Sequence, residues 1–172
     1  MAGMDVFEAV RTILAVRSYK DQQVPEEVVR RILEAGRLTA SASNKQPWHF
    51  IVVEDRATLR RLGELVPSGP YIPQAALAIV VAIDRTPLAV SDASRAIQSM
   101  LLVTWGDGVG SNWVGFVGGL EAVGQLLNVP AELDVLAILP FGYPAVPVGR
   151  GNKRRKSLPE VAARERYGQP YD

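Results

Sequence analysis

The stretch AALAIVVAI, residues 75–83, decides the class of fold. Nine consecutive apolar residues that end in a run of Ile and Val are typical of a buried β-strand. Working outward, further strands are predicted at WHFIVV (residues 48–53), at VLAILPF (residues 135–141) and at a short stretch after a glycine-rich turn (residues 112–114). Helical patterns fill the intervals, at residues 4–16, 25–38, 56–66, 91–105 and 119–127. This mixture predicts an α/β or α+β protein and argues against a helical bundle or a β-sandwich.

Particular side chains suggest where three of the helices begin or end. Apolar residues at helical spacing predict an amphipathic first helix that ends near Val16, and they are Val6, Phe7, Val10, Ile13 and Leu14. Pro25 and the two glutamates after it mark the start of the second helix, because proline fits a first turn and acids complement the helix dipole. Ser91 or Asp92 is expected to cap the long helix over 91–105.

The bulk composition excludes several classes of protein. The chain has 172 residues, of which 48% are hydrophobic and 22% charged, and this predicts a single domain over residues 1–172. No apolar run has the length of a membrane helix, and the first residues do not resemble a signal peptide, so we expect a cytoplasmic protein. Without cysteine, and with His49 as the only histidine, the chain has no thiol nucleophile and no predicted metal site.

The net charge of +1 hides a basic C-terminal segment. Residues 148–172 hold seven basic and three acidic side chains, whereas residues 1–147 hold 12 basic and 15 acidic ones. Residues 143–172 have few apolar side chains for their length, so we expect this basic tail to fray or to dock, with a second copy of the chain as one partner. The basic run over 150–156 has no aromatic residues interleaved, so nucleic acid is not the expected partner.

Two polar segments could bind a ligand. Arg17-Ser18-Tyr19-Lys20 places two cations around a hydroxyl and could hold a phosphate, although cations also favour an ordinary helix C-terminus. Residues 41–47 gather hydroxyl and amide groups before a strand, which could bind a polar ring or form an ordinary solvated loop. His49 follows this loop, and in such a place histidine is more often hydrogen-bonded structure than a catalyst.

The glycine-rich segment GDGVGSNWVGFVGG, residues 106–119, could let the backbone approach a ligand or a neighbouring element closely. It is not a dinucleotide-binding fingerprint, because it follows a helix and lacks the third glycine at the required spacing. No P-loop and no nucleophile elbow is present. Cations, neutral polar groups and few nucleophiles together suit an enzyme whose cofactor performs the difficult chemical step.

In order as well as content, the chain resembles the FMN-dependent nitroreductase family. The resemblance covers nearly the whole chain and rests on RSYK, SASNKQPWHF, DASRAIQSMLLVTWGDGVGSNWVGF and LPFGYPA followed by RGNKRRKSL. It implies an α+β fold with a central, mainly antiparallel sheet flanked by helices. It also implies an intertwined homodimer with FMN sites at the interface, on which the 143–172 tail docks.

The resemblance also suggests the residues that would bind FMN. For the phosphate and ribityl chain they are Arg17, Ser18 and Lys20, joined by Lys153 and Arg155, and Tyr19 is a further predicted cofactor-binding residue. From the other subunit, Ser41, Ala42 and Asn44 would contact the ring and ribityl chain, and Gln46 would lie near the ring. The backbone around Val114, Gly115 and Phe116 would face the flavin nitrogen that receives hydride.

The activity implied is hydride transfer from NAD(P)H through FMN to a nitroaromatic, a quinone or a similar flat small molecule, by a ping-pong mechanism. The chain departs from the family where Val16 replaces an arginine, where Lys20 replaces another, and where the stretch between Asp84 and Asp92 is short. We therefore expect a pocket that is open or completed by the partner. The alternatives are a flavin enzyme of the same family with a dedicated substrate, a flavin-binding module without turnover, and an RNA-binding tail at 150–156.

Overall fold

The structure is a computed structural model that describes residues 4–115, 120–149 and 153–171. Within these residues four strands form one sheet in the order β1-β2-β4-β3, and every pair of neighbours is antiparallel. The strands are β1 (Trp48–Val53), β2 (Leu77–Asp84), β3 (Gly110–Ser111) and β4 (Leu133–Gly142). The prediction of an α+β fold with a mainly antiparallel sheet is confirmed.

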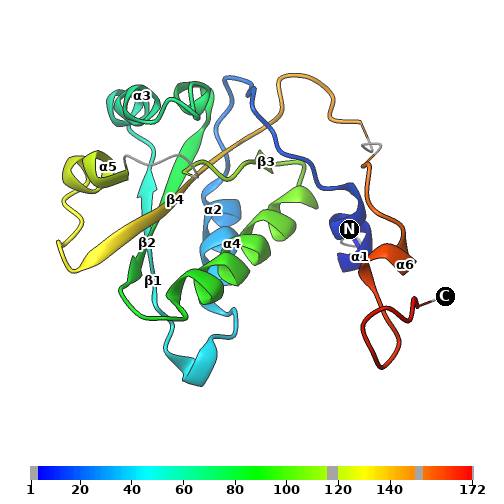
Figure 1. Ribbon diagram of the computed structural model, residues 1–172. Helices are drawn as coiled ribbons and strands as arrows, with labels where there is room; N and C mark the ends of the chain where they lie inside the picture. The colour runs from blue at the N-terminus through cyan, green and yellow to red at the C-terminus, as the bar shows by residue number, and fades with distance from the viewer. Residues whose placement is uncertain (1–3, 116–119, 150–152, 172) are drawn as a thin grey trace.

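Helices cover both faces of the sheet (Figure 1). The described α-helices are α1 (Val6–Thr12), α2 (Glu26–Arg37), α3 (Arg56–Leu65), α4 (Ala89–Trp105), α5 (Leu120–Leu126) and α6 (Leu158–Val161), with short 3₁₀ turns η1 (Ala42–Asn44) and η2 (Ile72–Gln74). α2 and α4 pack on one face, and α3, η2 and α5 pack on the other. None of these helices combines the length and the apolar character that crossing a membrane requires.

The strand that the apolar run predicts is β2, which lies between β1 and β4 and is buried except at Asp84. Its side chains alternate between the two cores. Ile79 and Val81 belong to the core under α2 and α4, whereas Ala78 and Val80 belong to the core under α3 and α5. Because both faces are covered, every position except Asp84 at the end is apolar, and the predicted buried strand is confirmed.

The first helix is shorter than its apolar pattern predicts. α1 ends at Thr12 and not near Val16, because the chain beyond it turns to pair with β3. The Val16 N–H donates to the Ser111 carbonyl at 2.9 Å. The approach is close enough that a Cβ on Gly110 would lie 2.3 Å from Val16 Cγ2, so a glycine is required there. The short strand predicted around 112–114 begins two residues earlier, since β3 is Gly110–Ser111, and Val114 forms only an isolated bridge to Ile138 of β4.

The long helix begins earlier than predicted. α4 starts at Ala89 with Leu88 as its N-cap, so neither Ser91 nor Asp92 caps it. Asp92 is instead buried inside the first turn, where its carboxylate accepts a hydrogen bond from a loop distant in sequence. A tertiary contact uses the side chain that local capping rules would place at the helix end.

The predicted apolar face of α1 points to solvent. Val6 is 71% and Phe7 73% exposed, and Val10 is also exposed, while the small Ala9 and the polar Thr12 face the protein. α1 lies at the edge of the molecule, and the described part of the tail, including α6, is also largely exposed (Figure 1). The large apolar side chains Val6, Phe7 and Val10 therefore do not contribute to the core of their own chain.

Candidate functional site

The segment 17–20 runs antiparallel beside the chain that leaves β4. The Lys20 N–H donates to the Tyr143 carbonyl at 2.8 Å, and the Ala145 N–H donates to the Ser18 carbonyl at 3.0 Å. This ribbon fixes the backbone of one predicted phosphate-binding segment against the segment that leads into the basic tail. Arg17 and Lys20 remain exposed, with their charges available to a ligand.

Tyr19 lies on the core side of this ribbon. Its hydroxyl donates toward two carbonyl oxygens, Val16 O at 2.7 Å and Pro140 O at 3.2 Å. Burial raises the pKa of the Tyr19 phenol above its ordinary value. The Tyr19 side chain therefore anchors the ribbon, and the predicted contact of Tyr19 with a cofactor stays a prediction.

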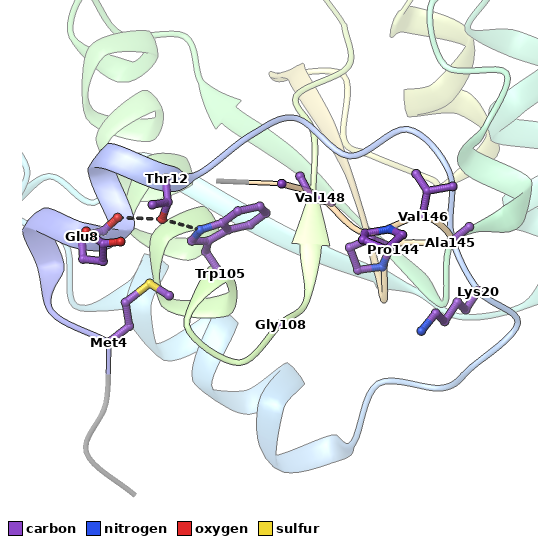
Figure 2. Close-up of a pocket in the computed structure, with 12 residues that line it drawn as sticks. Met4, Glu8, Thr12, Lys20, Trp105, Gly108, Pro144, Ala145, Val146 and Val148 are labelled. Atoms are coloured by element: carbon purple, nitrogen blue, oxygen red, sulfur yellow. Dashed lines mark hydrogen bonds between the residues drawn. The ribbon is translucent and has the colours of Figure 1, made fainter. Parts of the chain in front are cut away.

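A cavity of about 530 Å³ opens beside Lys20. Figure 2 shows that its wall is formed by α1, by the end of α4 and by the segment 144–149. Trp105 lies in this wall, and its indole N–H donates to Thr12 Oγ1 at 2.9 Å. Neither Trp105 nor 144–149 is predicted as a site from the sequence, where the one signal is the Pro- and Val-rich run after β4. The volume is that of a small-molecule site.

A cluster of cations lies on the α1 side. The Lys153 ammonium donates to the Val10 carbonyl at 2.8 Å. Burial, and then the nearby charges of Arg155 and Arg11, hold the pKa of Lys153 below its ordinary value. Arg11 is not predicted from the sequence, and it forms an ion pair with Glu8 at 2.7 Å. Two of the predicted phosphate ligands are thus brought together, although in the described segments no hydrogen bond links them to residues 17–20.

The second polar segment, the loop Ser41–Gln46, is closed by its own groups. Ser41 Oγ accepts the Gln46 N–H at 2.9 Å, and the Gln46 side-chain amide donates to the Asn44 carbonyl at 3.2 Å. The Ala42 N–H donates to Asp92 Oδ2 at 3.0 Å, which fixes the loop to the beginning of α4. The exposed Asn44 and Gln46 could present amide groups to a polar ring.

The two predicted parts of the site lie at opposite ends of the sheet. Residues 41–46 precede Trp48, which pairs with the last residues of β2, whereas the 17–20 ribbon lies beside Gly142, near the first residues of β2. The eight residues of β2 span about 23 Å at about 3.3 Å per residue. Along α4, Asp92 at the loop and Trp105 at the cavity are about 20 Å apart at 1.5 Å per residue. One chain therefore does not bring the two parts together.

The backbone predicted to face the reactive ring is only partly available. The Val114 N–H donates to the Ile138 carbonyl at 3.0 Å, and its own carbonyl accepts the Ile138 N–H at 2.9 Å. The Val114 amide is thus used by the sheet, so of the two described residues in this prediction only Gly115 keeps a backbone N–H that could face the flavin. Gly115 has φ of 131°, and a Cβ there would lie 3.2 Å from the Leu136 carbonyl, so glycine is required. Phe116 lies outside the described residues.

His49 forms a surface pair rather than part of either cluster. Its Nε2 lies 2.9 Å from Asp84 Oδ1, and both side chains are about half exposed. The interpretation of His49 as a hydrogen-bonded structural residue fits this position. Across the described segments, no three acidic or histidine side chains gather as they would to hold a metal ion.

Comparisons with known proteins agree with this fold. A sequence profile of the nitroreductase family matches residues 11–84 and 72–143. A protein of Methanothermobacter thermautotrophicus, provisionally named NADH dehydrogenase/NAD(P)H nitroreductase, is 36% identical over 153 residues, covering 84% of this chain and 80% of the relative. A solved structure from Bacteroides thetaiotaomicron with the same provisional name has a TM-score of 0.86 at 28% identity, over 98% of this chain and 99% of that one.

A second solved structure holds a cofactor. It is a provisionally named nitroreductase from Desulfovibrio desulfuricans in complex with FMN, with a TM-score of 0.79 at 30% identity over 95% of this chain and 98% of that one. The sheet, the helices on both faces and the order of the sequence motifs define an α+β oxidoreductase fold. The chain belongs to the nitroreductase family.

Proposed function

We propose that the protein is an FMN-dependent oxidoreductase that takes hydride from NAD(P)H and reduces a flat acceptor such as a nitroaromatic or a quinone. Family membership and the names of the relatives support the cofactor, the reductant and the class of reaction. FMN, when bound, supplies the carrier that accepts hydride from one substrate and releases electrons to the next in a ping-pong cycle. We place the reaction in the cytoplasm, where NAD(P)H is available.

The chemistry of the two predicted binding segments fits FMN. A phosphate dianion is bound well by several cations. Arg17 and Lys20 can supply two from one segment, with Lys20 in the cavity wall, and Lys153 and Arg155 can supply two from a second segment beside α1. A flavin ring requires neutral donors and acceptors, and these are what the exposed Ser41–Gln46 loop offers. Of the described residues predicted to face the flavin, Gly115 could donate its backbone N–H to the reactive ring nitrogen, a role that needs no acidic side chain.

The observation that carries the proposal is the separation of these two parts by the length of the sheet. If both parts hold the same FMN, they must belong to two chains, since one chain places them about 20 Å apart. A twofold axis would bring residues 41–46 of one protomer to the 17–20 ribbon of its partner, and the converse, which makes two equal sites. The proposed unit is therefore a homodimer, and each chain is a single FMN-binding domain that completes its partner's site.

The exposed apolar residues support such an intertwined dimer. Val6 and Phe7 on α1, and Leu158 and Val161 in the tail, are all more than half exposed in the single chain. Large apolar side chains grouped in this way are typical of a surface that is covered in the assembly. Docking of the 143–172 tail on the partner would bury Leu158 and Val161.

Access for the acceptor is expected to be open. The connection between β2 and α4 is only four residues, Arg85–Leu88, and carries no helix of its own. Leu88 and Val90, at the start of α4, are both 54% exposed near the loop that would meet the flavin ring. A flat, partly apolar acceptor suits such an entrance better than a large polar one.

The test is anaerobic rapid mixing of the FMN-reconstituted protein with NADH or NADPH, followed by a second mixing with nitroaromatics or quinones. The expected result is bleaching of the flavin absorbance in the first step and its recovery in the second. A protein that takes up no FMN would contradict the proposal. Bound FMN that neither nucleotide bleaches would favour a binding module, and turnover of a single acceptor would favour a dedicated enzyme of the same family.

A further inference from the structure

Asp92 is the only charged side chain that is buried among the residues the structure describes, with 1% of its surface exposed. Its Oδ2 accepts a hydrogen bond from the Ala42 N–H at 3.0 Å, and its Oδ1 pairs with the half-exposed guanidinium of Arg95 one turn along α4. A carboxylate is removed from water at high cost unless such partners compensate it. The contact with Ala42 joins α4 to the Ser41–Gln46 loop.

That loop has an unfavourable backbone. Ser43, Asn44 and Gln46 have φ of 50°, 54° and 49°, in the left-handed region that residues with a Cβ rarely adopt. Such residues persist only where the surroundings hold them, and they concentrate at sites that contact ligands. Within the described segments, the Asp92–Ala42 hydrogen bond is the only one by which a side chain outside residues 41–46 holds this loop.

We propose that Asp92 is a positioning residue for FMN, which it does not touch. Its carboxylate fixes Ala42, and through Ala42 it keeps Asn44 and Gln46 in the left-handed backbone conformation in which both residues are exposed. This inference rests on the proposed function, which gives the loop a flavin to contact. The loop would contact the FMN whose phosphate is bound by the partner's cations. Loss of Asp92 in one protomer would therefore weaken FMN binding at the site that contains the partner's cations.

The test compares FMN titrations of the full-length parent with Asp92→Ala, Asp92→Asn and Ala42→Pro. Asp92→Ala removes the acceptor, and we expect the FMN dissociation constant to rise about tenfold or more, as loss of a hydrogen bond to a charged group implies. Asp92→Asn keeps an acceptor oxygen for Ala42 and should stay within about threefold of the parent. In the protein without FMN, the Ala42 amide should exchange with solvent faster in Asp92→Ala than in the parent or in Asp92→Asn.

Ala42→Pro removes the donor rather than the acceptor. The loop backbone tolerates proline there, because Ala42 opens the 3₁₀ turn and Ser41, at φ −128° and ψ 158°, has the extended conformation that a residue before proline prefers. Ala42→Pro should weaken FMN binding as Asp92→Ala does. Combined with Asp92→Ala it should add almost nothing, since both changes remove the same hydrogen bond.

Asp55→Ala is the matched control, because Asp55 is also a carboxylate that accepts a backbone N–H, that of Thr58 at 2.7 Å at the start of α3. It should lower the stability of the fold without changing FMN affinity. Parent-like FMN affinity in Asp92→Ala, additive effects of the two loop variants, or equal loss in Asp92→Asn would each overturn the inference while leaving the proposed function intact. A parent protein that binds no FMN would overturn both.

Discussion

Phe7→Ala separates the stability of the single chain from the stability of the proposed dimer. In the single chain the Phe7 side chain is 73% exposed, so its removal costs the fold little. The position is helical, and alanine has a higher helix propensity than phenylalanine. The isolated protomer should therefore unfold at a urea concentration close to that of the parent, with a change in free energy within about 0.5 kcal/mol.

Phe7→Ala should weaken the association of the two protomers strongly. Full burial of a phenylalanine is worth about 1.5–3 kcal/mol, and the 73% still exposed in the protomer corresponds to about 1–2 kcal/mol. A twofold interface contains two copies, which gives about 2–4 kcal/mol for each dimer. The dimer dissociation constant should then rise by about 30-fold to 1000-fold. FMN affinity should fall at protein concentrations where the variant is monomeric, because each site would lack the partner's loop.

Sedimentation velocity over a dilution series measures the dissociation constant, and urea unfolding below that constant measures the protomer. Arg60→Ala is the control, since Arg60 is exposed on α3, away from α1 and the tail. It should change neither quantity. A Phe7→Ala protein with the parent's dissociation constant would refute the assignment of the α1 apolar face to the interface.

Three further predictions concern the site. Arg17→Ala and Arg155→Ala should each weaken FMN binding by about 1.5–3 kcal/mol in a flavin titration, if each loses one charge-assisted hydrogen bond, and unchanged affinity in both would mean that the phosphate is misplaced. Because the pKa of Lys153 is lowered, its ammonium loses its proton at a lower pH than that of an ordinary lysine. FMN affinity should therefore be present at low pH and fall as the pH rises through that pKa. In Lys153→Arg the fall should move to higher pH, and pH profiles of FMN affinity that coincide with the parent's would argue against a role for this charge. His49→Phe should leave single-turnover hydride transfer nearly unchanged, since in the described segments the only hydrogen bond of the His49 side chain is to the exposed carboxylate of Asp84, and a large loss would show that His49 participates.

The elements that follow local patterns could be predicted from the sequence. The apolar run at 75–83 yields β2, because a strand with helices on both faces needs no polar position. Pro25 and the acids after it yield α2, which begins at Glu26. These patterns depend on neighbouring residues, so no knowledge of distant contacts is needed.

The errors occur where distant residues intervene. Val16 leaves the helical pattern because Ser111 offers its backbone a partner in β3. The sequence predicts Asp92 as a candidate N-cap, but its carboxylate accepts a hydrogen bond from the Ala42 N–H, in a loop 50 residues earlier. In the site, the sequence suggests the ligand-binding segments but cannot show that two of them lie at opposite ends of the sheet. That separation depends on the strand register.

The central claim is that each FMN site is built from two chains, and mixed dimers test it most directly. Arg17→Ala should damage the cationic part of the site, and Asn44→Ala should damage the loop part. If these two variants are mixed and exchange subunits at random, half of the dimers carry one protomer of each kind, and one of their two sites is fully intact. The FMN concentration is set above the dissociation constant of the parent and below those of the two variants, so that neither variant alone is loaded. The account predicts that about a quarter of all sites in the mixture then bind FMN that NAD(P)H bleaches. No recovery after verified subunit exchange would mean that each site lies within one chain and would contradict the account.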